Sequence, residues 1–459
     1  MSSTTSRRAR STPQVDRLRV VVAAGGTGGH VFPGIAVAAA LQRRVPEAVV
    51  TFAGTADRLE ATLVPAAGYE LDTTPMVAFP RRPGLAALLF PARFVRCVLG
   101  ARRQLRRRGA QVVVGVGGYP SVPAVVAGWT LRLPVVVHES NATPGLANRL
   151  AARLSGRVAC AFDPASAGLG ARAEVRQVGI PILPALAACD RESLRGPARA
   201  SWGVEDDELL VVVSGGSLGA ASLDRAAVEL ACAAVATGAT GTTGTSRAAD
   251  AVDAVGALHG RRLRLVVKAS PTHVASLRAA LARGGGDQVA EVVEHIDDMA
   301  AAYSAADAVV VRGGACTVAE IEHLGVPAVV VPLPSATDDH QTANAEALAA
   351  SGRAPVVVVR DGDLDGETLA AALARVVALA EAAEACLPKD PDSGSAPPRG
   401  ASPHADAADA VARWVVELAP AVASVDAPAA SSAVSAASSI SSSSSSSSRS
   451  TSTTEGTTR

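Results

Sequence analysis

Three glycine-rich turns, each directly after an apolar run, constrain the fold of this chain more than any other feature. The first is Gly25–His30, which follows the run Leu18–Ala24 and precedes the helical stretch Ile35–Arg44. In such a turn backbone N–H groups can approach a ligand closely, because glycine carries no Cβ. Its spacing matches neither the dinucleotide fingerprint nor the P-loop. The other turns are Ser214–Gly219 and Arg312–Ala315, and three such units predict two nucleotide-type domains that face each other.

The apolar runs indicate parallel sheets. They lack the polar alternation of a half-exposed strand, so both faces of each strand should be buried under helices. In 233–246 the alternation requires a strand, but the residues are mostly Ala, Gly and Thr. The expected fold class is α/β, with two doubly covered parallel sheets. The expected strands are 18–24, 49–53, 111–116, 134–138, 157–162 and 174–178, followed by 209–213, 262–268, 289–294, 307–311, 327–331 and 355–359.

Length and local composition predict two domains with flanking segments. A chain of 459 residues is too long for one ordinary domain. Pro181–Pro184 interrupts the strand–helix alternation and indicates a hinge, and the serine tract Ser441–Ser448 cannot bury enough apolar surface to fold. The expected division is a disordered N-terminus at 1–17, Rossmann-like domains at 18–182 and 183–386, a loop and C-terminal helix at 387–419, and a disordered serine-rich tail at 420–459.

Charge and cysteine usage narrow the possible partners. The 43 basic and 43 acidic side chains cancel, so no overall field attracts nucleic acid, and no nucleic-acid partner is expected. The six cysteines contain no C-x-x-C pair, which favours reduced thiols over a disulfide framework or a zinc site. No signal peptide and no transmembrane helix are expected from the apolar pattern.

Polar side chains follow the first-half strands where ligands bind in open α/β sheets. His30 ends the first glycine turn, Tyr119 follows Gly115–Gly118, and His138–Asn141 follows another apolar run. The donors and acceptors of His138–Asn141 suit a sugar or peptide. Simpler interpretations remain open: a tight turn before a helix for 25–30 and a packing aromatic for Tyr119. Asp57 and Arg58 are better explained as a local ion pair than as catalytic groups.

The second half offers an anion site. The N–H groups of 215–219 and the Ser217 hydroxyl can hold an anion at a helix N-terminus. Thr317 can donate a hydroxyl to phosphate, and Glu320 can accept two ribose hydroxyls, although it could be a solvated helix acid. Cys316 has no adjacent base in the sequence, which disfavours a nucleophile. The run Asp338–His340 favours helix caps over a metal site, and no metal is expected.

The segment Phe79–Gly109 combines an apolar surface with an excess of arginine. One interpretation is an amphipathic helix that faces the core and has a solvated basic side. The other is an interfacial helix that rests on an anionic bilayer. The apolar members are Leu85, Leu88, Leu89, Phe90, Phe94 and Val95, and the basic members are Arg81, Arg82, Arg93, Arg96, Arg102, Arg103, Arg106, Arg107 and Arg108.

Taken together, the motifs resemble those of the MurG family of glycosyltransferases. The resemblance extends over about residues 18–380, with the strings in the family's order. These strings are GGTGGHVFPG (25–34), GTADRLEATLVP (54–65), GVGGYPSVP (115–123), HESNATPGLAN (138–148), GGSLGA (215–220), IDDMAAAY (296–303) and ACTVAEI (315–321).

The resemblance implies a GT-B fold and an inverting, metal-independent transfer with no cofactor. It implies UDP-GlcNAc as donor, undecaprenyl-diphosphate-MurNAc-pentapeptide (lipid I) as acceptor, and a peripheral position on the cytoplasmic side of the cell membrane. His30 is the first candidate for the general base, with Glu139 second. By motif position the donor residues are Thr27, Gly28, Gly29, Asn141, Ser217, Ile296, Ala315, Cys316, Thr317, Val318, Ala319, Glu320 and Gln341, and further family positions are Tyr119, His138, Asn148, Arg312 and Asn344.

The chain departs from the family pattern at a few positions. Leu183 stands where many members carry an arginine that meets the donor diphosphate, and Asp224 stands where some have Asn. Region 233–246 matches the family poorly. Two rival functions follow: a UDP-GlcNAc 2-epimerase of the same fold, which needs no lipid-facing helix, and a non-catalytic UDP-sugar-binding paralogue.

Overall fold

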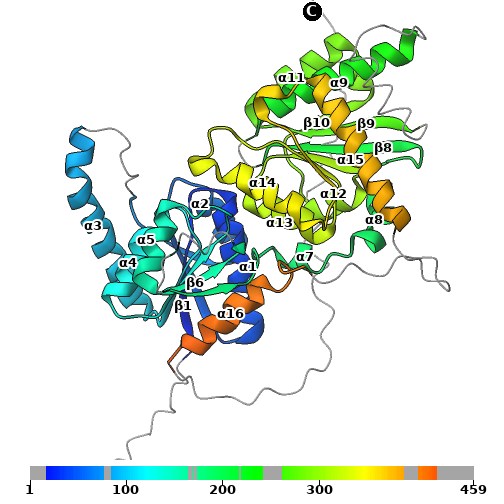
Figure 1. Ribbon diagram of the computed structural model, residues 1–459. Coiled ribbons are helices and arrows are strands. Elements are labelled where there is room, and N and C mark those ends of the chain that lie inside the picture. Colours follow the sequence, from blue (N-terminus) through cyan, green and yellow to red (C-terminus); the bar gives the residue numbers. More distant parts are fainter. Residues whose placement is uncertain are drawn as a thin grey trace, which may run out of the picture. The chain divides into compact units, whose positions relative to one another are not determined.

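The computed structural model describes residues 17–76, 84–163, 169, 173–216, 219–240, 261–386 and 402–420. Two series of strands alternate with helices along the chain (Figure 1). The first series is β1 (Arg19–Ala23), β2 (Val49–Gly54), β3 (Glu70–Thr73), β4 (Val112–Gly115), β5 (Val135–Glu139), β6 (Arg157–Cys160) and β7 (Glu174–Gln177). The second is β8 (Glu208–Ser214), β9 (Arg262–Lys268), β10 (Ala290–Val293), β11 (Ala308–Val311), β12 (Ala328–Val330) and β13 (Val356–Val358).

The helices fall into the same two series. Those of the first are α1 (Gly28–Arg44), α2 (Glu60–Ala66), α3 (Leu85–Arg108), α4 (Val122–Thr130) and α5 (Leu146–Ser155), with the short 3-10 helix η1 (Tyr119–Ser121). Those that follow are α7 (Pro184–Ala187), α8 (Arg191–Ser201), α9 (Ala221–Thr240), α11 (Pro271–Gly284), α12 (Met299–Ala305), α13 (Ala315–Leu324), α14 (His340–Ser351), α15 (Gly366–Cys386) and α16 (Ala407–Leu418), with η2 (Gly286–Gln288), η3 (Thr337–Asp339) and η4 (Asp361–Asp363).

Each series forms one sheet, and the strand pairs in both sheets are parallel. The seven-stranded sheet has the order β3-β2-β1-β4-β5-β6-β7, and the six-stranded sheet has the order β10-β9-β8-β11-β12-β13. We call each sheet with the helices packed on it a lobe, the first lobe and the second lobe. The prediction of an α/β fold with two parallel sheets is confirmed.

The order of strands explains where the glycine turns lie. In the first sheet β1 pairs with both β2 and β4, and in the second β8 pairs with both β9 and β11, so the chain direction across each sheet reverses at these neighbours. Ligands of open α/β sheets bind at such switch points, beyond the carboxyl ends of the strands. The turns after β1, β4, β8 and β11 are glycine-rich, so all four flank a switch point.

Three predicted elements differ from the structure. Strand β3 was missed because its residues, Glu70–Thr73, are mostly polar and form an edge strand. Helix α1 begins at Gly28 instead of Ile35, so Gly28, Gly29 and His30 form its first turn. In region 233–246, where the alternation favours a strand, the described part is helical: α9 continues to Thr240, and its buried leucines and alanines belong to the core of the second lobe. Residues 241–260 lie outside the described residues.

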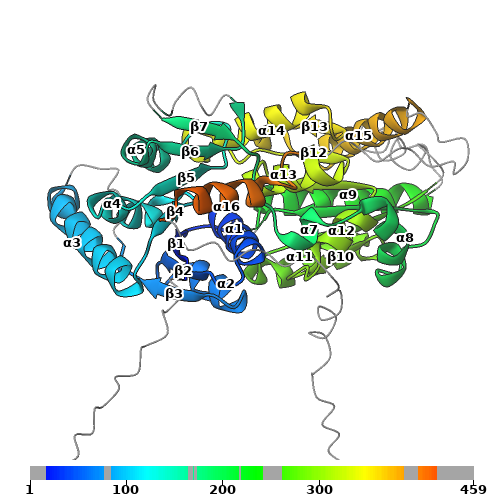
Figure 2. The ribbon, with the colours of Figure 1, turned by 90° about the horizontal axis from the view of Figure 1, so that it is seen from below.

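The C-terminal helix belongs to the first lobe. Figure 2 shows α16 beside α1, and its buried residues Val411, Trp414 and Val415 share one core with Val20 and Val22 of β1. The guanidinium of Arg176 lies 4.2 Å from the centre of the Trp414 ring. Residues separated by almost the whole chain therefore complete one hydrophobic core.

A buried carboxylate ties the start of the second sheet together. Asp307, just before β11, forms ion pairs with Arg195 (2.6 Å) and Arg199 (2.9 Å) of α8 and with Arg261 (2.9 Å) before β9. It also accepts a hydrogen bond from the backbone N–H of Leu210 in β8 (2.7 Å). Although burial acts to raise it, the pKa of Asp307 is lowered by these arginines.

Some predicted segments lie outside the described residues. These are the N-terminal segment up to Asp16, Arg81 and Arg82, Ser217, residues 387–401 of the predicted C-terminal loop, and the serine-rich tail from residue 421. Within the part of the chain that the structure describes, no helix is long and apolar enough to cross a membrane.

Candidate active site

Glu60 fixes the first glycine turn. Its side chain is fully buried and accepts hydrogen bonds from the backbone N–H of Gly26 (3.0 Å) and from the N–H and hydroxyl of Thr55 (3.0 and 2.6 Å). A Cβ at Gly25 would lie 2.5 Å from the Glu60 carboxylate, so the turn requires glycine there. The side chain of Thr27 does not cap α1, which leaves the amides of its first turn able to face a ligand.

His30 lies in that first turn, against the glycines after β4. A Cβ at Gly117 would lie 3.0 Å from Nδ1 of His30, and one at Gly118 would lie 2.9 Å from its Cδ2. Both glycines also have positive φ values. Burial, with a smaller contribution from His340 of the second lobe, lowers the pKa of His30 to about 4. The imidazole is therefore neutral at neutral pH and able to accept a proton.

His138, at the end of β5, is held in one tautomer. Its Nε2 donates to the carbonyl of Gly179 (2.9 Å), so its Nδ1 accepts from the Ser140 hydroxyl (3.1 Å). Burial lowers the pKa of His138 to about 4. The side chain is fully buried and links β5 to the segment that leaves β7.

Glu139 organises the loop that follows β5. Its carboxylate accepts hydrogen bonds from the N–H and the side-chain amide of Asn141 (2.9 and 3.2 Å), the N–H of Gly145 (3.2 Å) and the side chain of Asn148 (2.9 Å). Burial raises the pKa of Glu139, and these four donors oppose the rise. Both oxygens are thus engaged within the protein.

In the second lobe, Glu320 of α13 is paired with Tyr303 of α12. The Tyr303 hydroxyl donates to Oε2 of Glu320 (2.9 Å). Burial raises the pKa of Glu320 to about 7, while the hydrogen bond from Tyr303 acts to lower it. Burial, reinforced by Glu320, also raises the pKa of the Cys316 thiol, which makes Cys316 a poor nucleophile.

Arg312 is buried and directed into its own lobe. It donates to Asp361 of η4 (2.6 Å), to the hydroxyl of Ser222 (2.8 Å) and to the carbonyl of Val331 (3.1 Å). The guanidinium therefore braces the turn after β11 against η4 and α9. Its positive charge still contributes to the electrostatics of the nearby glycine turns.

Asn344 connects the two lobes. From α14 its Oδ1 accepts from the N–H of Ala142 (2.8 Å), and its Nδ2 donates to Oδ1 of Asn141 (3.2 Å) and to the carbonyl of Gly313 (3.1 Å). The residue is fully buried. The loop after β5 and the turn after β11 are thereby joined through one side chain.

A second contact between the lobes uses a backbone carbonyl in α1 that a proline leaves without its helical donor. Pro33 in α1 has no N–H to donate to the carbonyl of Gly29, four residues earlier. The Cys316 thiol from the first turn of α13 lies 3.6 Å from that carbonyl and donates to it. The N-terminal ends of α1 and α13 thus come together, as the glycine turns predicted.

The remaining predicted residues are placed as follows. Gly28, Gly29, Ala315, Val318 and Ala319 lie in the first turns of α1 and α13, and Thr317 is partly exposed there. Gln341 accepts from the N–H of Leu333 (2.9 Å). Ile296 and Leu183 pack at the edge of the second lobe's core, Tyr119 is partly buried at the start of η1, and Asp57 and Arg58 are exposed.

The loop before α14 forms local hydrogen bonds, but Asp339, at the N-cap position of α14, accepts none from a backbone N–H of the helix, so the predicted side-chain cap is not present there. The Thr342 hydroxyl donates to Asp339 (2.7 Å), and Nδ1 of His340 lies 2.6 Å from the carbonyl of Thr337. Among the described residues, no group of three or more His, Cys, Asp or Glu is placed to hold a metal ion.

Two residues that organise the site were not singled out from the sequence. Glu60 and Tyr303 both lie within motif strings, in GTADRLEATLVP and IDDMAAAY. The only signal was a carboxylate and a phenol in otherwise apolar helical stretches, where a buried polar group needs a partner.

Two parallel sheets with glycine turns at both switch points, joined through the ends of α1 and α13, define a protein of the GT-B fold. The solved structure of MurG from Acinetobacter baumannii superposes with a TM-score of 0.58 at 25% identity and covers 87% of this chain and 99% of that one. The UDP-GlcNAc 2-epimerase of Neisseria meningitidis superposes with a TM-score of 0.56 at 12% identity, over 87% and 99%, which shows the shared fold alone.

The chain belongs to glycosyltransferase family 28. The N-terminal domain of that family matches residues 20–160, and its C-terminal domain matches residues 210–389. Curated relatives named UDP-N-acetylglucosamine–N-acetylmuramyl-(pentapeptide) pyrophosphoryl-undecaprenol N-acetylglucosamine transferase are similar over most of their length. That of Rhodococcus jostii is 40% identical over 353 residues, 76% of this chain and 84% of the relative, and that of Mycobacterium bovis is 40% identical over 368 residues, 78% and 81%.

Proposed function

We propose that this protein transfers N-acetylglucosamine from UDP-GlcNAc to the muramoyl 4-hydroxyl of undecaprenyl-diphosphate-MurNAc-pentapeptide, forming lipid II. The observation that carries the proposal is the 40% identity to transferases of that name over about three quarters of the chain. The geometry agrees with it, since the predicted donor and acceptor motifs meet at the ends of α1, α13 and β5.

The second lobe provides the groups for the donor. Helix α13 starts after Gly314 with no side-chain cap, so its first amides can bind the diphosphate, with Thr317 adding a hydroxyl. Glu320, oriented by Tyr303, accepts the ribose hydroxyls. Asn141 reaches this site from the first lobe through its contact with Asn344.

The chemistry is a single displacement. The acceptor hydroxyl attacks the anomeric carbon, its proton passes to a base, and UDP leaves with the bonding electrons. We assign the base to His30, because its imidazole is neutral and lies in the first turn of α1 next to Cys316 of the donor lobe. Glu139 is the weaker candidate, because four hydrogen bonds already occupy its carboxylate.

Helix α3 is the proposed membrane surface. Leu85, Leu88, Val95 and Leu99 are 70%, 77%, 55% and 49% exposed, an unusual density of exposed aliphatic groups on one helix. Arg93, Arg96, Arg103 and Arg106 are exposed on the same helix. Apolar groups flanked by arginines suit the interface of an anionic bilayer, where a polyprenyl-linked acceptor resides.

The proposed function is tested by incubating radiolabelled UDP-GlcNAc with a short-chain lipid I analogue in EDTA. Label in the lipid product supports the transferase, and transfer in the presence of the chelator supports metal independence. UDP-ManNAc formed from UDP-GlcNAc without acceptor would identify an epimerase instead. Binding of UDP-GlcNAc with no transfer would identify a non-catalytic paralogue.

A further inference from the structure

Two buried histidines hold the peptide group between Gly179 and Ile180, at the start of the segment that leaves β7 for the second lobe. From the end of β5, Nε2 of His138 donates to the Gly179 carbonyl (2.9 Å). The N–H of Ile180 donates to Nδ1 of His404, in the segment that enters α16 (2.9 Å). The carbonyl and the N–H of one planar peptide point in opposite directions, so the two imidazoles fix its orientation from both sides.

His404 extends this contact to α13, the helix that carries the proposed donor groups. Because Nδ1 of His404 accepts a hydrogen bond, the ring proton is assigned to Nε2, which donates to Oε2 of Glu322 (3.1 Å). Glu322 is buried and lies two residues after Glu320 on α13, and its other oxygen lies 3.6 Å from Nε of Arg353. Both ring nitrogens of His404 are therefore used, one toward the segment after β7 and one toward α13.

The two segments that connect the lobes are in direct contact at this point. Gly179 has a φ of +84°, and a Cβ there would lie 2.6 Å from the carbonyl oxygen of Pro403 and 3.0 Å from Nδ1 of His404. Only glycine suits both this conformation and this space. The N–H of His404 donates to the Ser402 hydroxyl (3.2 Å), and Ile180 is buried in the same core cluster as residues of α13. Both segments are thus packed in place.

We propose that His404 and Glu322 are positioning residues for the transfer, because they fix α13 to the 179–180 peptide and thereby set how the donor lobe meets His30. Helix α13 is then held near both ends, by Cys316 at its start and by Glu322 in its last turn. This inference rests on the proposed function, since it takes His30 as the group that must meet the donor.

A positioning role predicts a loss of turnover rather than of donor affinity. Without the bond between His404 and Glu322, α13 can shift relative to the first lobe. Most groups proposed to bind the donor lie on the second lobe and move together with α13, so the dissociation constant for UDP-GlcNAc should change little. His30 lies on the first lobe, so its distance from the donor should change, and a misplacement of about 1 Å can lower the rate by about 100-fold.

The experiment measures kcat for transfer to the lipid I analogue, per mole of folded protein, and the dissociation constant for UDP-GlcNAc by calorimetry. His404→Asn keeps an acceptor for the N–H of Ile180, but its shorter side chain does not reach Glu322. Glu322→Gln keeps an acceptor for the Nε2 proton of His404, whereas Glu322→Leu removes the acceptor and keeps a similar volume.

We expect kcat to fall about 10- to 100-fold in His404→Asn and in Glu322→Leu, with little change in the dissociation constant. Glu322→Gln should retain most of the wild-type kcat, because the bond to His404 can still form. The double variant His404→Asn/Glu322→Leu should lose no more than either single variant, because both changes remove the same bond. Glu322→Leu serves if His404→Asn does not fold.

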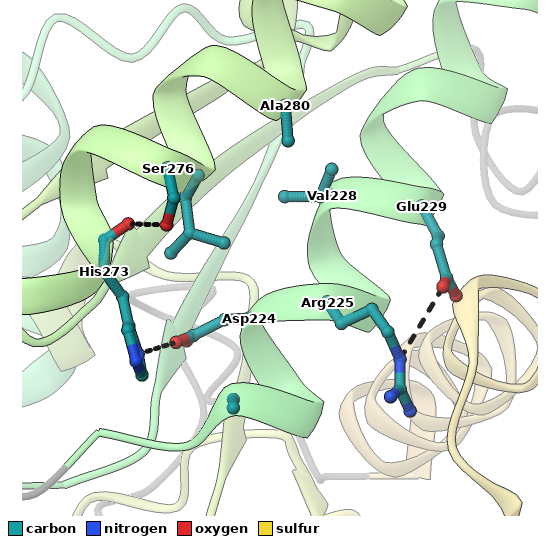
Figure 3. Close-up of a pocket in the computed structure, with 9 residues that line it drawn as sticks. Asp224, Arg225, Val228, Glu229, His273, Ser276 and Ala280 are labelled. Atoms are coloured by element: carbon teal, nitrogen blue, oxygen red, sulfur yellow. Dashed lines mark hydrogen bonds and ion pairs between the residues drawn. The ribbon is translucent and has the colours of Figure 1, made fainter.

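Two control variants separate this effect from general losses. In Figure 3 His273 of α11 faces Asp224 of α9, with 3.9 Å between Nδ1 and Oδ2, so this histidine–carboxylate contact lies within the second lobe. His273→Asn should leave kcat unchanged. Val376→Ala opens a cavity in the core under α15, and it should lower the melting temperature without lowering kcat where the variant is folded.

Wild-type kcat in both His404→Asn and Glu322→Leu would overturn the inference and leave the proposed function standing. Equal losses of kcat in Glu322→Gln and Glu322→Leu would also overturn it, because the bond to His404 would then not matter. A loss of kcat in Val376→Ala as large as that in His404→Asn would reduce the role of His404 to stability and overturn the inference as well. Absence of transfer by the wild type would instead overturn the proposed function, and the inference with it.

Discussion

His30 is the residue on which the proposed transfer chemistry depends most. Removing a general base lowers the rate by about 10²- to 10⁴-fold, so we expect His30→Ala to lose kcat on that scale. The dissociation constant for UDP-GlcNAc should change little, because the residues proposed to bind its diphosphate and ribose lie mainly on the second lobe. Transfer to the lipid I analogue gives kcat, and calorimetry gives the dissociation constant.

His295→Ala removes an exposed imidazole of the second lobe and should leave both values unchanged. Turnover that persists in His30→Ala would exclude His30 as the base. Glu139 would then be the group to test next.

We expect Tyr303 to set the pH range in which Glu320 binds the donor ribose, the role proposed for Glu320. The pKa of Glu320 is about 7, and the Tyr303 hydrogen bond lowers it by favouring the carboxylate. Tyr303→Phe should raise that pKa, so the fall in kcat/KM for UDP-GlcNAc on acidification should begin at a higher pH than in wild type. A pH profile that does not move would show that Glu320 does not bind the donor as a carboxylate.

For single residues, the sequence predicted which residues belong to the candidate site better than it predicted what their side chains contact. His30, Glu320 and Asn344 were singled out because they follow glycine turns or stand at motif positions, and the structure shows what each one touches. Glu60 was not singled out, because its role depends on a contact with Gly26, 34 residues earlier. The sequence alone does not distinguish a buried acid in a short helix from an acid on the protein surface. The sequence also provided no indication of the burial that lowers the pKa of His30.

Among the elements, the second sheet depends on Asp307. Removing the carboxylate in Asp307→Ala leaves the guanidinium of Arg199, only 10% exposed, and two half-buried arginines without their shared partner. We expect a loss of about 3–5 kcal/mol in the free energy of unfolding, measured by urea denaturation.

Asp207→Ala is the matched control, because its ion pair with Arg262 is exposed on both sides and should contribute far less to the free energy of unfolding. The pKa of Asp307 is lowered in the folded state, so its contribution is present above the unfolded pKa and is lost as the pH falls below about 4. Equal losses in the two variants would contradict the role of Asp307.

Helix α3 makes a prediction of its own. Replacing Arg96, Arg103 and Arg106 by Glu should release the protein from vesicles containing anionic lipid, because the three side chains are exposed and each contributes about 1 kcal/mol near such a surface. Arg102 is left unchanged, since it donates to the Thr130 hydroxyl (2.6 Å). Co-sedimentation measures the bound fraction.

Charge reversal at the exposed Arg283, Arg360 and Arg375 makes the same net change on the second lobe and should leave vesicle binding intact. If the α3 variant binds vesicles as well as the wild type does, α3 is an ordinary amphipathic helix and not a membrane surface.

The elements themselves were mostly predictable, and the errors have physical causes. Apolar runs buried on both faces gave a strong signal for the central strands. Strand β3 is polar because an edge strand needs only one packed face, and its Asp72 pairs with Arg107 and Arg108 of α3. The sequence did not predict that α1 begins at Gly28, because Pro33 argues against a helix at that point. The helix tolerates Pro33 because this residue lies near its N-terminal end.

For the molecule as a whole, Asn344 provides one of the contacts that join the lobes. Asn344→Ala leaves the buried N–H of Ala142 and the carbonyl of Gly313 without this partner, at a cost of about 1–3 kcal/mol. The side chain of Asn141 also loses its support. We therefore expect kcat/KM for UDP-GlcNAc to fall about tenfold or more, with a modest loss of stability.

Gln288→Ala, at an exposed position of η2, is the control for general effects of amide removal. Unchanged kcat/KM in Asn344→Ala would mean that the contact between the lobes does not support donor binding. Such couplings could not be derived from the sequence, because the partners lie about 200 residues apart and no local pattern records which loops meet.

Because α16, near the C-terminal end of the chain, packs on α1, the first lobe is not formed from one continuous stretch of polypeptide. A gene fragment that stopped after β7 would leave α1 without its covering helix and would expose to water the apolar side chains that pack in one core with Trp414. Such a fragment should aggregate, whereas one that carries the 407–418 stretch grafted beyond β7 should stay monodisperse.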